Sequence, residues 1–140
     1  MAIENYIPTN NRSQFITKGS NTILMDAYNA NPTSMKAALL NFEKLNNKIK
    51  IAVLGDMFEL GKDAEKEHLY IADLCSTLLL DKVILVGKNF FKTTLVSTKV
   101  MSYKSFEDFK NHVDLSKIEN KTFLIKGSRG MALERVLELL

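Results

Sequence analysis

Three short, almost wholly apolar segments constrain the fold of this chain more than any other feature of its sequence. They cover residues 49–54, 83–86 and 122–125. Apolar runs of this length are typical of β-strands that are covered on both faces. The segments between them are longer, and their apolar residues recur every three or four positions, as on the inner face of a helix. Buried strands that alternate with amphipathic helices predict a parallel sheet joined by right-handed crossovers.

Further strands complete this pattern at both edges of the predicted sheet. Residues 14–17 and 21–25 flank a Lys-Gly-Ser turn and predict an antiparallel hairpin. A short strand is predicted over 100–103, and a closing helix with an apolar inner face over 133–140. The predicted fold class is therefore α/β, a Rossmann-like three-layer domain with a mostly parallel sheet and an antiparallel edge hairpin.

Capping signals indicate where the other helices begin. Asn31 followed by Pro32 is a typical N-cap and first-turn pair. A second helix is predicted from about Asp63. Ser105 with Asp108 three residues later resembles a capping box and predicts a short helix after it.

Length and charge bound the domain count and exclude one class of partner. The chain has 140 residues, enough for one ordinary domain. We interpret 14–140 as that domain and 1–13, which carry Pro8 and no apolar periodicity, as a linker or domain entry. The formal charge of +3 comes from basic residues scattered among nearly as many acidic ones. No basic stripe suited to nucleic acid emerges.

The apolar segments and the cysteine content bear on location and redox chemistry. No apolar run approaches the roughly 20 residues of a membrane span, and the N-terminus lacks the basic-then-apolar order of a signal peptide. We therefore expect a cytoplasmic protein with no membrane partner. The single cysteine, Cys75, lies on the apolar side of a predicted helix, which favours a buried and inert thiol.

Polar and glycine-containing segments follow three of the predicted strands. They cover residues 26–32, 55–61 and 126–131. In open α/β sheets ligands bind beyond the carboxyl ends of the strands, so these segments are the candidate site. They offer carboxylates, amides and cations suited to a phosphorylated or carboxylated ligand. The structural alternative is that Asp26 and Asn31 only cap the next helix and that the glycines only end strands.

Other familiar sites are not supported by the sequence. Five residues separate Gly55 from Gly61, and Asp63 stands where a P-loop needs Ser or Thr, so the phosphate-binding motif fails here. The dinucleotide fingerprint G-x-G-x-x-G is also absent. His68 and His112 are far apart in sequence and have no ligand at useful spacing, so no metal site is predicted.

Four motifs resemble, in order and spacing, the C-terminal domain of the Mur ligases that add D-alanyl-D-alanine. They are NRSQ at 11–14, DAYNANP at 26–32 followed by SM, LGDM at 54–57 followed by ELG, and KGSRGM at 126–131. The likeness covers essentially the whole chain. The tyrosine-asparagine version of the second motif separates these ligases from relatives that add single amino acids.

The resemblance implies an ATP-dependent amide ligase of peptidoglycan biosynthesis with three domains. Its first domain would hold a UDP-sugar, and its central domain would carry the P-loop and the Mg²⁺ ligands, so 1–13 would enter from a missing central domain. ATP would phosphorylate the terminal carboxylate of UDP-N-acetylmuramoyl-tripeptide, and the amine of D-alanyl-D-alanine would attack the acyl phosphate. The C-terminal domain would close over that site. This chain alone is therefore predicted to be inactive.

The same resemblance implies roles for individual residues. Arg12 would contact the ATP phosphates and stabilise the charge that develops during phosphoryl transfer. Asp26 would bind the nucleotide ribose, and Asn29 and Asn31 would hold ATP or shape the loop. The residues implied near the dipeptide or the acyl phosphate are Asp56, Lys126, Ser128 and Arg129. For Arg129 the alternative is a salt bridge that closes the loop.

A receiver-like signalling domain is the second function class that the sequence allows. Asp26, Asp56 and Lys126 at successive strand ends imitate its phospho-acceptor site. The imitation is partial, because that site uses paired acids after the first strand, Ser or Thr after the fourth, and usually a proline beyond the lysine. Here Gly87 and Gly127 occupy the last two places.

Overall fold

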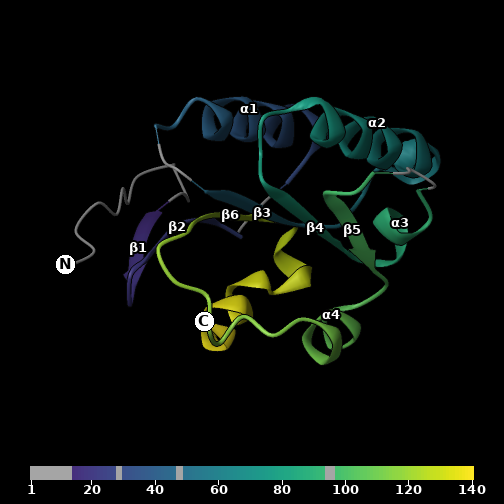
Figure 1. Cartoon of the computed structure of the whole chain (residues 1–140). Helices are drawn as coiled ribbons and strands as arrows, with labels where there is room; N and C mark the ends of the chain where they lie inside the picture. The colour runs from purple at the N-terminus through teal and green to yellow at the C-terminus, as the bar shows by residue number, and fades with distance from the viewer. Residues whose placement is uncertain (1–13, 28–29, 47–48, 94–96) are drawn as a thin grey trace.

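Six strands form one sheet in the spatial order β1-β2-β6-β3-β4-β5 (Figure 1). The structure is a computed structural model and describes residues 14–27, 30–46, 49–93 and 97–140. Strand β1 pairs antiparallel with β2, and every other pair in the sheet is parallel. The fold class predicted from the sequence is confirmed. The strands are β1 Gln14–Lys18, β2 Asn21–Asp26, β3 Lys50–Gly55, β4 Lys82–Val86, β5 Val100–Tyr103 and β6 Thr122–Lys126.

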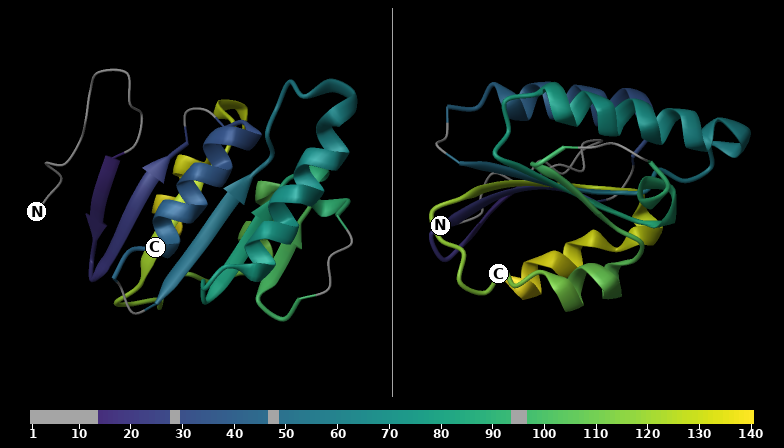
Figure 2. Two further views of the ribbon diagram at one scale, coloured as in Figure 1. Left: turned by 90° about the horizontal axis from the view of Figure 1, so that it is seen from above. Right: turned by 45° about the vertical axis from the view of Figure 1, so that its right-hand side comes forward.

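Helices cover both faces of this sheet and complete the three layers (Figure 2). Helices α1 (Pro32–Glu43) and α2 (Ala64–Thr77) lie on one face, and α4 (Phe106–His112) lies on the other with the 3₁₀ segment η3 (Leu133–Leu139) (Figure 1). No helix in the described ranges has the length and apolar character that a bilayer crossing requires. The remaining elements are η1 (Gly61–Asp63), α3 (Lys88–Phe91) and η2 (Arg129–Met131).

Two elements differ from the sequence prediction. Helix α3 was not predicted, because four residues are too few to produce a periodic apolar pattern. The closing helix exists but is a 3₁₀ helix. Its buried residues Leu133 and Val136 are three positions apart, a spacing that suits a 3₁₀ helix as well as an α-helix over so few turns.

Alternation along the central strands gives the domain one apolar core on each face of the sheet. In β3, Ala52 and Leu54 pack under α1 and α2, whereas Ile51 and Val53 face α4 and η3. Cys75 lies in the first core with none of its surface exposed, and this burial raises the pKa of its thiol to about 12. The prediction of a buried thiol is confirmed, and a thiol that stays protonated is a poor nucleophile.

The topology places a switch point at the carboxyl end of β6. The connections that leave β2 and β3 run to the α1 and α2 face, whereas the segment after β6 runs to the opposite face (Figure 1). Strand β6 lies between β2 and β3. The chain therefore leaves β6 toward the opposite face of the sheet from the connections of both neighbouring strands. Ligands of open α/β sheets bind at such switch points.

The N-cap of α1 supplies a test of local stability. The Asn31 Oδ1 atom accepts a hydrogen bond from the Ser34 N–H at 2.8 Å, and Ser34 Oγ accepts one from the Asn31 N–H at 3.1 Å. Asn31→Ala removes the side-chain acceptor and is expected to lower the free energy of unfolding by about 1 kcal/mol, measured by urea denaturation. Asn31→Asp keeps an acceptor and should change stability far less, so equal losses in both variants would contradict this account.

Candidate functional site

An ion pair spans the switch point at the ends of β2 and β6. Asp26 and Lys126 are partners in the register of these two parallel strands. The Lys126 Nζ atom lies 2.7 Å from Asp26 Oδ2, and the two side chains are only 3% and 17% exposed, respectively. The structure therefore brings together two residues that the sequence placed beyond the carboxyl ends of the strands, an edge of the sheet that we call the rim. At the switch point the pair sets a positive and a negative charge side by side.

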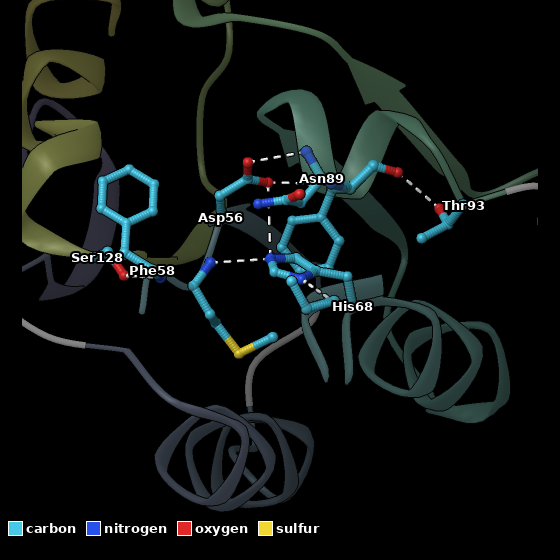
Figure 3. Close-up of polar contacts among 9 residues, drawn as sticks. Asp56, Phe58, His68, Asn89, Thr93 and Ser128 are labelled. Atoms are coloured by element: carbon cyan, nitrogen blue, oxygen red, sulfur yellow. Dashed lines mark hydrogen bonds and ion pairs between the residues drawn. The ribbon is translucent and has the colours of Figure 1, made fainter. Parts of the chain in front are cut away.

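Asp56 lies at the end of β3 and holds the first turn of α3 (Figure 3). Its carboxylate accepts hydrogen bonds from the Asn89 N–H at 2.9 Å and from the Phe90 N–H at 3.0 Å. A carboxylate at a helix N-terminus is stabilised by those unpaired N–H groups. The carboxylate can come this close because Gly87 has no side chain. A Cβ atom there would lie 2.3 Å from the Asp56 carboxylate.

His68 fixes the loop that follows Asp56. Its Nε2 atom accepts a hydrogen bond from the Met57 N–H at 2.9 Å, and its Nδ1 atom lies 2.6 Å from the Ala64 carbonyl oxygen (Figure 3). These partners require a neutral ring with its proton on Nδ1. Asp56 Oδ1 is 3.8 Å from Nε2, which is too far for a hydrogen bond. The ring is fully buried, so His68 has a structural role.

Ser128 joins the loop after β6 to the loop after β3. Its Oγ atom accepts a hydrogen bond from the Phe58 N–H at 2.8 Å, and its own N–H donates to the Asp56 carbonyl oxygen at 3.1 Å. Ser128 is 94% buried by these contacts. The next residue, Arg129, begins η2 and is exposed. Two of the three predicted ligand segments are therefore bound directly to each other.

Three predicted site residues remain, Arg12, Asn29 and Asn31. Arg12 and Asn29 lie outside the described residues. Asn31 is described, and its side-chain oxygen is used in the α1 cap. The ligand roles predicted for these three residues therefore stay predictions, as do those of the residues on the rim. Within the described ranges, no group of three or more His, Cys, Asp or Glu side chains is arranged to hold a metal ion.

Beside the rim lies a cleft of about 270 Å³ that sequence reasoning missed. Lys88, Lys104 and Arg135 contribute three cations to its lining. Lys88 is two residues beyond the end of β4. The rule that ligands bind beyond the carboxyl ends of the strands could therefore have found it. Arg135 gave no such signal, because it lies within a closing helix whose position against the sheet only the fold defines.

The strand order does not support a receiver domain. In chain order the five parallel strands are β2, β3, β4, β5 and β6, so their spatial order is 1-5-2-3-4. Receiver domains have the order 2-1-3-4-5. In addition, both carboxylate oxygens of Asp56 are occupied by the α3 cap. The alternative function therefore lacks structural support.

The fold is a doubly wound α/β domain, and the predicted ligand segments meet at its topological switch point. Comparison with known families matches residues 11–129 to the model described as "Mur ligase, glutamate ligase domain". The chain therefore belongs to the Mur ligase family and corresponds to its C-terminal domain.

Relatives and solved structures agree with this assignment. The UDP-N-acetylmuramoyl-tripeptide–D-alanyl-D-alanine ligase of Bacillus subtilis is 36% identical over 84% of this chain and 27% of its own length. The corresponding ligase of Rickettsia prowazekii is 29% identical over 93% of this chain and 30% of its own length. A crystal structure of MurF from Acinetobacter baumannii superposes with a TM-score of 0.79 at 31% identity, over 96% of this chain and 30% of that one. The chain thus spans about three tenths of the length of these relatives.

The contact between Gly87 and Asp56 can be tested by adding one methyl group. Gly87→Ala places a Cβ atom against the Asp56 carboxylate at a φ of 133°, and we expect a loss of about 3 kcal/mol or more in the free energy of unfolding. Gly61→Ala is the matched control, since Gly61 also has a positive φ of 57° but has nothing within 4 Å of a Cβ. It should cost only about 1 kcal/mol. Urea denaturation measures both, and similar losses would contradict the role given to the contact.

Proposed function

We propose that this chain is the closing domain of an ATP-dependent ligase of the bacterial cytoplasm. That ligase joins D-alanyl-D-alanine to UDP-N-acetylmuramoyl-tripeptide in peptidoglycan biosynthesis. The observation that carries the proposal is the match of nearly the whole chain to ligases named for this reaction, at up to 36% identity over more than four fifths of the chain. A structural neighbour at 24% identity with a TM-score of 0.74, the MurF ligase from Thermotoga maritima, was crystallised in complex with ADP.

The geometry of the rim suits such a reaction. ATP would phosphorylate the terminal carboxylate of the tripeptide, and the amine of the dipeptide would attack the acyl phosphate. Each step develops negative charge on phosphoryl or carbonyl oxygens, which fixed cations stabilise. The ion pair with Asp26 holds the Lys126 ammonium at the switch point, where three of the parallel strands end.

Individual residues receive the following proposed roles. Arg12 contacts the ATP phosphates, and Asp26 accepts hydrogen bonds from the ribose hydroxyls. Asn29 and Asn31 hold ATP or shape its loop. The residues assigned to the dipeptide or the acyl phosphate are Asp56, Lys126, Ser128 and Arg129. The Mg²⁺ ligands are assigned to the central domain, and the described residues of this chain present no group of acids or histidines that suits the ion.

Closure of this domain over the other two would serve the ligase reaction in two ways. Holding two substrates and ATP together makes the attack effectively intramolecular, and excluding water protects the acyl phosphate from hydrolysis. A domain separated from its partners provides neither benefit. The 140-residue chain is therefore expected to show no ligase turnover by itself.

Joining this chain to the first two domains of the Bacillus subtilis relative tests the proposal. We expect the chimera to release phosphate from ATP only when both the tripeptide precursor and D-alanyl-D-alanine are present, while the chain alone forms no amide. Lys126→Met in the chimera removes the ammonium at the switch point and should lower turnover by about 100-fold. The control Lys110→Met changes an exposed lysine of α4 and should leave turnover unchanged.

Two results would contradict the proposal. Amide formation by the 140-residue chain alone would show that it is not a lid for other domains. Phosphate release by the chimera that does not depend on D-alanyl-D-alanine would exclude the dipeptide as its acceptor.

A further inference from the structure

The cleft beside the rim carries an inference of its own. It lies at the carboxyl ends of β3 and β4, where Asp56 and Gly87 line it, and extends to Lys104, which directly follows β5. The ion pair of Asp26 and Lys126 lies at the ends of β2 and β6 instead. Neighbouring strands are about 4.8 Å apart, so the ends of β6 and β4, two strands apart, are separated by about 10 Å. The same edge of the sheet thus holds two adjacent subsites.

Three cations from three separate elements line this cleft. Lys88 begins α3, Lys104 precedes α4, and Arg135 lies in η3. Within the described part of the chain, neither lysine ammonium forms an ion pair. The acid in the lining of the cleft, Asp56, already receives two N–H donors from α3. The cleft therefore has an excess of positive charge that suits an anion.

Arg135 is held ready to receive such an anion. Its guanidinium carbon lies 4.0 Å from the centre of the Phe106 ring. Its Nε and one of its terminal nitrogens donate to the carbonyl oxygens of Ala132 and Met131 at 2.9 and 2.8 Å. An arginine fixed by stacking and by backbone contacts loses little further entropy when it binds a ligand. The guanidinium has five N–H donors, and these two bonds leave the others for a ligand.

The size and the walls of the cleft define the kind of anion. At about 270 Å³ the cleft is smaller than a typical pocket for a drug-sized ligand, so it suits a small anion. Phe58, Phe106 and Met131 line the cleft with apolar surface beside the cations. A small ligand with a carboxylate and methyl groups matches this combination. D-Alanyl-D-alanine has one carboxylate and two methyl groups.

We propose that this cleft binds the carboxylate of D-alanyl-D-alanine through Lys88, Lys104 and Arg135, an assignment that rests on the proposed function. The methyl groups then lie against Phe58 and Met131. An extended dipeptide spans about 7 Å, which covers most of the roughly 10 Å between the ends of β4 and β6 when its amine is directed toward the switch point. There the amine would meet the acyl phosphate held near Lys126.

Binding to the 140-residue chain tests the assignment, because every residue of the cleft belongs to it. Amide resonances of the ¹⁵N-labelled chain are followed by NMR during titration with D-alanyl-D-alanine, D-alanyl-D-alaninamide, inorganic phosphate or ADP with Mg²⁺. We expect the dipeptide to shift the resonances around Lys88, Lys104 and Arg135. The amide, which lacks the carboxylate charge, should bind about tenfold more weakly.

Substitutions separate this subsite from general attraction to a basic protein. Lys88→Gln and Lys104→Gln change exposed side chains and should each weaken binding of the dipeptide by about threefold to tenfold. Lys110→Gln removes the same charge from the outer surface of α4 and should leave binding unchanged. Binding of the dipeptide amide should be insensitive to all three substitutions.

Four outcomes would overturn the carboxylate assignment and leave the proposed function standing. In the first, the dipeptide shifts resonances at Asp26 and Lys126 but not in the cleft. In the second, the dipeptide and its amide bind equally well. In the third, inorganic phosphate binds the cleft more tightly than the dipeptide, which would make it a phosphoryl subsite. In the fourth, the chain responds to ADP but not to the dipeptide while the chimera is active. An inactive chimera and a chain that responds to neither ligand would instead overturn the proposed function.

Discussion

The network around the buried residue Asp56 holds the ligand edge of this domain together. Its backbone N–H donates to the Val86 carbonyl oxygen, and its own carbonyl oxygen accepts from the Ser128 N–H. Its carboxylate caps α3. One residue thus joins the ends of β3, β4 and β6. Among the described residues, no buried side-chain nitrogen or oxygen lacks a hydrogen-bond partner, so the network is complete as well as buried.

Close packing beneath this network explains two of the glycines at the edge. A Cβ atom on Gly127 would lie 2.9 Å from the Leu133 side chain and 3.0 Å from the Gly55 backbone, and one on Gly55 would lie 2.8 Å from Leu133. Leu133 can therefore cover the ends of β3 and β6 only because both positions lack a side chain. This contact fixes the start of η3 and, two residues later, the position of Arg135 beside the cleft.

Sequence reasoning could predict the features that depend on local pattern. The apolar runs gave β3, β4 and β6, and the strand-end rule placed Asp26 and Lys126 on one edge of the sheet. Features that depend on contacts between residues distant in sequence could not be predicted. The cap of α3 comes from Asp56, more than thirty residues away, and no periodicity reveals it. The cleft was also missed, because its three cations come from segments that only the folded sheet brings together.

The position of β6 has a consequence for how the chain reaches its native state. Strand β6 lies between β2 and β3, yet its residues are 100 positions from their partners in β2. Until β6 is available, the β1-β2 hairpin and the β3-β4-β5 sheet cannot be joined, and each exposes an unpaired strand edge. Because loop closure over such a span is entropically costly, high contact order should make folding slow. The switch point and the ion pair across it therefore cannot form before β6 has joined the two parts of the sheet.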